Sequence, residues 1–236
     1  MGEKGKLYLI PCLLFPETEQ QVLPSFNSGI IKGLSHFLVE NERSARRFIS
    51  GLNLGLKIEE LRFYRLDKDT QSIDIEAVIQ LIMGGNDVGV ISEAGCPGVA
   101  DPGALAVSMA HKNDIEVIPL IGPSAILLSL MASGFNGQSF VFHGYLPIEK
   151  NERVLWLKKL EKEAISKHQT QLFIETPYRN EALFTDIVAF CQPNTQLCVA
   201  CDITSPNQFI KTTTIAKWKK EKPDLSKRPT VFLLWG

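Results

Sequence analysis

The sequence lacks any apolar run long enough to cross a membrane. The longest, from Ala125 to Ala132, includes a serine and falls well short of the roughly 20 residues that a bilayer requires. The apolar run near the N-terminus is interrupted by Pro11, and no small-residue cleavage site follows it, which argues against a signal peptide. The sequence therefore favours a cytoplasmic protein without a membrane segment.

An excess of one charge is also missing. Lysine and arginine number 25 against 26 aspartates and glutamates, which gives a net charge of −1. Because no global positive field exists to attract nucleic acid, an RNA partner would need a local basic patch. Trp218 lies among the basic residues and would either stack on a base or pack beneath an amphipathic helix. The local candidates are Arg43, Arg46, Arg47, Lys217, Lys219, Lys220 and Lys222.

Neither a disulfide framework nor a metal site is indicated. The five cysteines are an odd number, which is typical of a reducing compartment in a chain of this length. Cys198 and Cys201 form a CxxC pair inside an apolar run that reads as a strand, so their side chains should point to opposite faces. The four histidines are scattered without metal-ligand spacing, and we expect no metal.

Short apolar runs alternate with helical patterns along the chain, which predicts an α/β fold. The clearest helix covers 73–83, another follows Asp101 over 102–112, and a third lies between Ser124 and Gly134. We expect two α/β domains, residues 1–120 with a mostly parallel sheet and residues 121–236 with a mixed sheet. The predicted strands are 6–10, 35–39, 61–64, 88–91, 115–120, 140–144, 171–175, 195–203, 208–214 and 230–235, and the later predicted helices are 153–167 and 178–190.

Three loops at strand ends have the residues of a ligand site. Residues 88–103 place Gly95, Pro97 and Gly98 after a buried strand, where a ligand can approach the backbone closely. Residues 119–134 place a Gly-Pro turn before a helix, and residues 175–179 bring together a carboxylate, an aromatic ring and a guanidinium. The alternative is that each is only a tight connection or a helix cap. No Gly-x-Gly-x-x-Gly or Gly-Lys-Ser/Thr motif occurs, which disfavours nicotinamide cofactors and ATP.

Together these segments resemble the SAM-dependent tetrapyrrole methylase superfamily, and in particular its bacterial branch of 16S rRNA 2′-O-ribose (cytidine) methyltransferases. The similarity spans nearly the whole chain. Its motifs appear in order as Gly5 to Pro11, Ser92 to Pro97 followed by Asp101 to Gly103, Leu120 to Ala125, Phe140 to Pro147, and Glu175 to Arg179.

The resemblance implies a homodimer that binds S-adenosylmethionine in a cleft between the two domains, mostly through backbone groups. Asp101 and Pro102 would support the first loop rather than touch the cofactor. The residues implied to border the cofactor are Pro11, Ser92, Glu93, Ala94, Gly95, Gly122, Pro123, Ser124, Ala125, Thr176, Cys201, Asp202 and Ile203.

The chain departs from the family pattern at three places. Residues 12–16 lack the family's Gly-containing turn, and residues 39–43 lose one carboxylate but gain another at the next position. Residues 201–205 replace a segment that carries two cations in the family, so the acceptor side is less well matched than the cofactor side.

Methyl transfer to a hydroxyl requires alignment and removal of a proton. We hypothesise that Glu40, Glu42 or Glu175 is the base and that Arg43 or Arg179 orients the acceptor or a phosphate. Glu40 and Glu42 read equally well as solvated carboxylates at a helix start. The acceptor expected from the resemblance is ribosomal RNA or the small ribosomal subunit; the alternatives are a small tetrapyrrole-like metabolite, or a SAM-binding protein without catalysis.

Overall fold

The computed structural model describes residues 3–236 and divides them into two compact units, up to Ser124 and from Ala125 onward. The expected junction near residue 120 thus falls a few residues later. Local contacts explain why the connecting residues stay with the first unit: the Asn27 amide donates to the Ile121 carbonyl at 2.8 Å, and the Cys96 thiol lies 3.5 Å from the Pro123 carbonyl.

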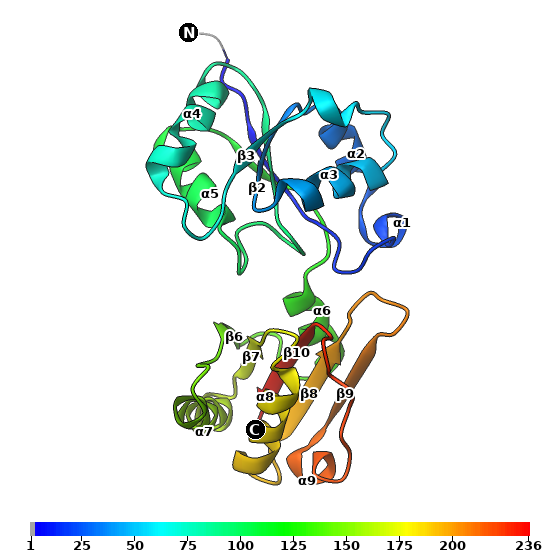
Figure 1. The fold of residues 1–236 in the computed structure, drawn as a ribbon. Helices are drawn as coiled ribbons and strands as arrows, with labels where there is room; N and C mark the ends of the chain where they lie inside the picture. The colour runs from blue at the N-terminus through cyan, green and yellow to red at the C-terminus, as the bar shows by residue number, and fades with distance from the viewer. Residues whose placement is uncertain (1–2) are drawn as a thin grey trace. The chain divides into compact units, whose positions relative to one another are not determined.

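The first unit is built on a fully parallel five-stranded sheet in the order β3-β2-β4-β1-β5 (Figure 1). Parallel neighbours need crossover connections, which explains why helices separate the strands in sequence. The strands are β1 (Leu7–Ile10), β2 (His36–Val39), β3 (Arg62–Arg65), β4 (Val88–Ile91) and β5 (Val117–Pro119), and the helices are α1 (Glu19–Val22), α2 (Ser25–Lys32), α3 (Glu42–Gly51), η1 (Ile58–Glu60), α4 (Ser72–Met83) and α5 (Gly103–Lys112).

Side chains of this sheet alternate between two apolar clusters. Leu7 of β1 and Val88 of β4 pack in a cluster with α4 and α5, whereas Tyr8 and Ile10 pack in a cluster with α2 and α3 on the other face. Period-two alternation in a strand places successive residues on opposite faces, so a sheet covered on both sides is apolar throughout. Figure 1 shows the two helix pairs on opposite sides of the sheet.

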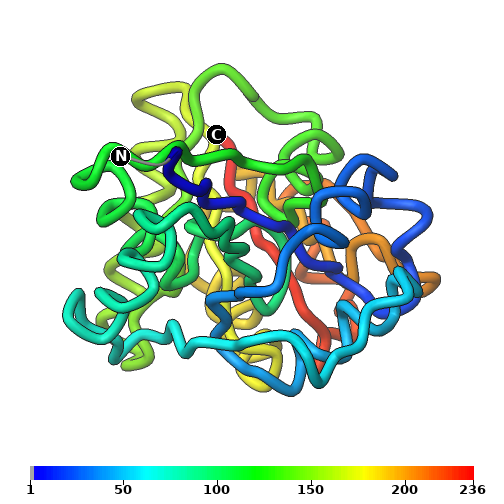
Figure 2. The backbone as a smooth tube through the Cα atoms, turned by 90° about the horizontal axis from the view of Figure 1, so that it is seen from above, coloured from blue at the N-terminus to red at the C-terminus, as the bar shows by residue number. Residues whose placement is uncertain are grey.

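The second unit has a mixed sheet in the order β6-β7-β10-β8-β9. β6 and β7 are parallel, while β10 is antiparallel to both β7 and β8, and β9 is antiparallel to β8. The last strand, red in Figure 2, therefore returns to the middle of its sheet. The strands are β6 (Phe140–Tyr145), β7 (Thr170–Ile174), β8 (Gln196–Cys201), β9 (Phe209–Thr214) and β10 (Thr230–Trp235), and the helices are α6 (Ala125–Ser133), α7 (Lys150–Lys167), α8 (Asn180–Phe190) and α9 (Ile215–Trp218).

The two faces of the second sheet also carry separate clusters, and they decide the geometry of the CxxC pair. Cys198 packs with Leu130 of α6 on one face, and Cys201 packs with residues of α7 and α8 on the other. The prediction that these thiols face opposite ways is confirmed. Burial raises the pKa of the Cys198 thiol to about 11 and raises that of Cys201 as well, which favours the unreactive thiol form of both.

Candidate functional site

The carboxyl ends of β1, β2, β4 and β5 meet at one edge of the first sheet because all four strands run in the same direction. Ligand sites of open α/β sheets lie at this edge. It carries Pro11 after β1, Glu40 after β2, Ser92 after β4 and Gly122 after β5. The first-unit candidates from four separate parts of the sequence are thereby brought to the same edge.

The loops after β1 and β4 are joined directly by their backbones. Cys12 and Gly95 form an isolated antiparallel bridge, with the Cys12 N–H donating to the Gly95 carbonyl at 2.8 Å and the reverse bond at 3.2 Å. The buried Ser92 hydroxyl donates to the same Gly95 carbonyl at 2.7 Å. Gly95 has φ of 76°, in the left-handed region that favours glycine. Ser92 therefore shapes the turn, while the neighbouring Ala94 is exposed.

The loop after β5 packs against the loop after β1. A Cβ atom at Gly122 would lie 2.3 Å from Pro11 Cβ and 2.7 Å from Pro11 Cγ. Only glycine fits this close approach, because the proline ring is buried and cannot rotate away. Pro123 is also buried, next to the Cys96 thiol. Three strand-end loops thus form one packed group of backbone turns.

Carboxylates gather beside these turns. Glu93 is exposed and accepts a hydrogen bond from the Ser44 hydroxyl at 2.5 Å. Partial burial, together with the negative charges of Glu93, Asp101 and Asp67, raises the pKa of Glu40. A carboxylate with a raised pKa is better matched to proton abstraction near neutral pH than an ordinary glutamate.

Asp101 has the supporting role expected for it. Its Oδ1 atom accepts from the Gly98 N–H at 2.6 Å and from the Gly103 N–H at 2.7 Å, so it binds the first N–H group of α5 and closes the preceding loop. Burial raises its pKa, and these two N–H groups oppose that rise. Pro102 comes directly before the helix.

The other candidates near the start of α3 differ from Glu40 in their contacts. Glu42 is ion-paired with Arg46 one turn along the helix, at 2.7 Å, and both side chains are largely exposed. Asn41 caps the helix by accepting from the Arg43 and Ser44 N–H groups. No ion pair joins the exposed Arg43 guanidinium to another residue in the described range 3–236, so it is available to an external anion.

In the second unit, Glu175 follows β7 and is 5% exposed. Its Oε1 atom accepts from the Thr176 N–H and from the Arg179 guanidinium, both at 2.6 Å. Its Oε2 atom and the Arg179 Nε atom are buried without hydrogen-bond partners in the described chain. The contact with Glu175 raises the pKa of Arg179. A buried polar atom without a partner costs about 1–3 kcal/mol, which a bound ligand would relieve.

Asp202 follows β8 at the same end of the second sheet, because β7 and β8 run in the same direction on either side of β10. It has φ of 47°, and its Oδ2 atom accepts from Arg228 Nε at 2.6 Å. The guanidinium of Arg228 also donates to the Asp224 and Asn207 carbonyls. Cys201 and Ile203 on either side are buried. Arg228 thus fixes the turn, a role that no local sequence signal indicated.

The predicted site residues therefore form two groups. The first group lies in the first unit and consists of Pro11, Ser92 to Gly95 and Gly122 to Ser124. Glu40, Glu42 and Arg43 belong to the same unit and lie where β2 leads into α3. Ala125 begins α6 and belongs to the second unit, together with Glu175, Thr176, Arg179 and the turn from Cys201 to Ile203.

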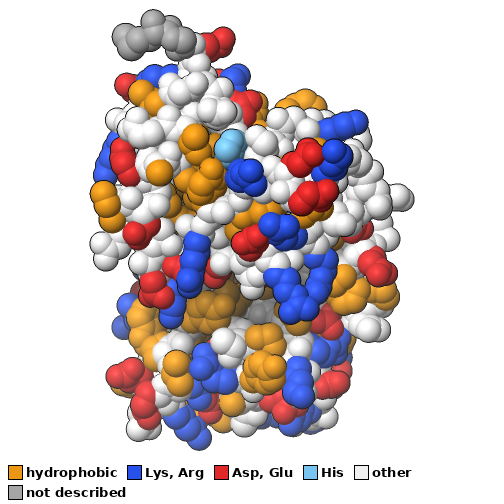
Figure 3. Space-filling model, turned by 45° about the horizontal axis from the view of Figure 1, so that its top comes forward, with side chains coloured by type: hydrophobic (Ala, Val, Ile, Leu, Met, Phe, Trp, Pro, Cys, Tyr) orange, Lys and Arg blue, Asp and Glu red, His pale blue; other side chains and the backbone are white. Residues whose placement is uncertain are grey.

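Basic residues form no single extended field on the face shown in Figure 3. On the face shown in Figure 3, lysine and arginine side chains are interspersed with aspartates and glutamates. Trp218, which could have stacked on a base, is 1% exposed and donates from Nε1 to the Leu197 carbonyl at 3.0 Å. Packing is therefore its role, and the base-stacking alternative is wrong.

Comparisons with known proteins assign the chain to a family. No protein-family model matches it. The protein named ribosomal RNA small subunit methyltransferase I from Thermotoga maritima is 32% identical over 174 residues, covering 69% of this chain and 76% of that protein. The chain belongs to the ribosomal RNA small subunit methyltransferase I family. The Buchnera aphidicola member is 27% identical over 210 residues, covering 88% of this chain and 71% of its own length.

Another member of the methyltransferase I family, from Synechocystis, is 32% identical over 129 residues, which cover 55% of this chain and 45% of that protein. The chain thus spans about half to three quarters of the length of these three relatives. Family membership rests on the matched part alone.

Solved structures support the fold of this methyltransferase I family member. The methyltransferase CobJ superposes with a TM-score of 0.65 at 17% identity, covering 98% of this chain and 94% of that one. Uroporphyrin-III C-methyltransferase from Thermus thermophilus, solved in complex with S-adenosylhomocysteine, gives a TM-score of 0.58 at 13% identity, covering 98% and 97%. The predicted α/β fold of the tetrapyrrole methylase type, with one parallel and one mixed sheet, is confirmed.

Two further features of the described residues bear on the site. None of the helices within residues 3–236 has both the length and the apolar character to cross a membrane. Over the same residues, no group of three or more histidine, cysteine, aspartate or glutamate side chains is placed to hold a metal ion.

Proposed function

We propose that this protein binds S-adenosylmethionine and transfers its methyl group to a ribose 2′-hydroxyl of ribosomal RNA in the small subunit. The observation that carries the proposal is the packed group of strand-end turns, found in a chain whose relatives are named ribosomal RNA small subunit methyltransferase I. A fold neighbour solved with S-adenosylhomocysteine supports the choice of cofactor.

The residues at the first-unit edge fit this cofactor chemically. S-adenosylmethionine has no phosphate, and the chain has no phosphate-binding glycine motif. The cofactor carries a positive sulfonium, and the edge offers the carboxylates of Glu40 and Glu93. When bound, the cofactor supplies a methyl group on a good leaving group. Backbone groups of Ala94, Gly95 and Gly122 would hold it, with contributions proposed from Pro11, Ser92, Pro123, Ser124, Ala125, Thr176, Cys201, Asp202 and Ile203.

Among the candidate bases, the observations favour Glu40. Its pKa is raised by partial burial and by neighbouring carboxylates, which makes it a stronger base than an ordinary glutamate carboxylate. Glu42 is already committed to an ion pair with Arg46. Glu175 holds Arg179 with one oxygen and keeps the other without a partner. We assign Glu40 to proton removal, and Arg43 and Arg179 to orienting the acceptor through its phosphates.

Two further expectations concern the location and the oligomeric state of the protein. The protein is proposed to act in the cytoplasm, where its substrate is made, and as a homodimer. Support for a dimer comes from β6, an edge strand on which Phe140 and Tyr145 are exposed, and from the exposed Leu155 of α7. Edge strands and exposed apolar groups are typical of surfaces that pair with another copy. Analytical ultracentrifugation would give a dimer mass, and a monomer at all concentrations would contradict this part.

The deciding experiment follows a labelled methyl group. The protein is incubated with S-adenosylmethionine carrying a tritiated methyl and with small ribosomal subunits or, separately, a metabolite extract. Label in ribosomal RNA that nucleoside mass spectrometry assigns to a 2′-O-methylribose supports the proposal. Label only in small molecules would support the metabolite alternative, and binding without transfer to either would support a protein that has lost catalysis; both results contradict the proposal.

A further inference from the structure

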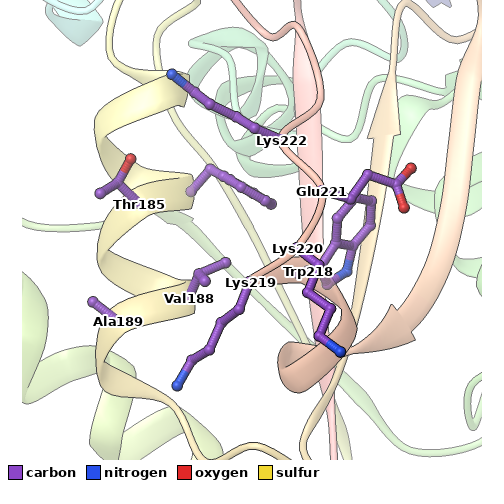
Figure 4. A pocket seen from close by; sticks show the side chains of 9 residues that line it. Thr185, Val188, Ala189, Trp218, Lys219, Lys220, Glu221 and Lys222 are labelled. Carbon is purple, nitrogen blue, oxygen red and sulfur yellow. The ribbon is translucent and has the colours of Figure 1, made fainter.

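A groove on the second unit lies outside the candidate site. We call it the α8–α9 groove: its walls are Thr185, Val188 and Ala189 of α8 on one side, and the turn of residues 218–222 on the other. Its volume is about 450 Å³. Figure 4 shows the side chains of Lys219 and Lys222 extending from the turn toward α8, Lys222 toward the end near Thr185 and Lys219 toward the end near Ala189.

The turn that carries these lysines is firmly held. Trp218 is buried, donates to the Leu197 carbonyl, and packs edge-to-face on Phe184 of α8 with ring centroids 5.5 Å apart. Backbone N–H groups of Lys219, Lys220 and Glu221 bond to carbonyls three or four residues earlier. The lysine backbones are therefore ordered before any ligand arrives, which lowers the entropy cost of binding.

The charge of this turn is positive and mostly unneutralised. The carboxylate of Glu221 is bound by Lys211, whose Nζ atom lies 2.6 and 2.5 Å from its two oxygens, so it does not offset the neighbouring lysines. Lys222 lies 3.8 Å from Glu181. Lys217, Lys219 and Lys220 are exposed, and none of them forms an ion pair with the described residues. The groove thus carries a local excess of positive charge in a chain with a net charge of −1.

We propose that the α8–α9 groove binds the phosphate backbone of single-stranded RNA, with the ammonium groups of Lys219 and Lys222 on successive phosphates. The apolar side chains of Val188 and Ala189 would lie beneath the sugar or base between them. Positive grooves with an apolar floor suit single strands, whose bases are unstacked and whose phosphates need counterions. This inference rests on the proposed function, since it assigns a second contact of the RNA substrate, away from the chemistry.

The test compares two double variants in the full chain. In Lys219→Gln/Lys222→Gln the groove loses both cations; in the control, Lys158→Gln/Lys162→Gln, the same charge is lost from exposed lysines of α7 that line another hollow. Binding is read by fluorescence anisotropy of a short fluorescein-labelled oligouridine across a salt series. We expect the groove variant to bind about tenfold more weakly, with a log–log salt slope smaller by about 1.4 for two lost single-strand phosphate contacts.

Unchanged affinity of the groove variant, or an equal loss in the α7 control, would overturn the inference and leave the groove to another partner. All four lysines are exposed, so both variants should melt at the wild-type temperature. The oligouridine assay contains no S-adenosylmethionine. A failure of methyl transfer by the wild-type protein therefore refutes the proposed function alone, whereas a failure of the lysine dependence refutes the groove alone.

Discussion

Both units place candidate residues at the carboxyl ends of parallel strands, but the groups found at those ends differ in kind. The first unit uses backbone turns and small residues, with Cys12 bridged to Gly95 and Gly122 packed on Pro11. The second unit uses charged side chains, with Glu175 holding Arg179 and Arg228 holding Asp202. In the proposed function, the first edge holds the cofactor through the shape of its turns, while the second edge positions charged side chains.

The largest effect should come from Glu40, a candidate base whose pKa is raised. Replacing Glu40 by glutamine should lower kcat of methyl transfer by on the order of a hundredfold to ten-thousandfold if it accepts the hydroxyl proton. The matched control is Glu42→Gln on the same turn, which should leave kcat unchanged. Equal rates for both variants would remove Glu40 from the mechanism.

The pH profile sharpens the same prediction. Because the pKa of Glu40 is raised, the carboxylate form is lost at a higher pH than for an ordinary glutamate as the pH falls. The acid limb of kcat/KM should therefore lie above the usual glutamate range. A wild-type acid limb at the usual glutamate pKa would contradict the assignment.

The next effect tests the close approach of two loops in the first unit. Gly122→Ala would place a Cβ atom 2.3 Å from Pro11, and the shift needed should cost about 1–3 kcal/mol of unfolding free energy. It should also weaken S-adenosylmethionine binding in calorimetry, because the turn must move. Gly137→Ala is the control, since nothing lies within 4 Å of its added Cβ. Wild-type stability and affinity in Gly122→Ala would show that the approach is not required.

The second unit offers the corresponding test at Arg228. Arg228→Gln removes a charge-assisted contact to Asp202 and should lower the free energy of unfolding by about 1–3 kcal/mol. If the Asp202 turn borders the cofactor, the dissociation constant for S-adenosylmethionine should also rise. The control is Arg47→Gln at an exposed position, which should change neither the free energy of unfolding nor this dissociation constant. A loss of stability without a change in affinity would limit Arg228 to a structural role.

The contrast between these two edges also explains what the sequence could predict. The strand-end turns were predictable because glycine and proline mark them locally, at Gly95 and Gly122. Arg228 was not, because it reaches Asp202 only when β10 inserts between β7 and β8. The contact of Ser44 with Glu93 joins residues 49 apart in the chain and leaves no local pattern. The role of Trp218 was open until its burial was known.

A smaller effect concerns the reactivity of the five cysteine thiols. Burial raises the pKa of the Cys12 thiol to about 11 and that of the Cys191 thiol to about 12. The pKa of Cys96 is raised as well, but among the described cysteines Cys96 alone is not fully buried. A thiol reagent at neutral pH should modify Cys96 slowly in the folded protein and all five cysteines after denaturation. S-adenosylmethionine should slow the reaction of Cys96, which lies next to the Gly95 turn. Rapid modification of a second thiol in the folded state would contradict the burial.

The most direct test of the account is hydrogen–deuterium exchange with and without S-adenosylmethionine. We predict slower exchange in peptides that cover residues 92–97 and 120–124 of the first unit and residues 175–177 and 201–204 of the second. Exchange at residues 217–222 should not change until RNA is added. No protection on adding the cofactor, or protection confined to segments away from these strand ends, would contradict the central claim.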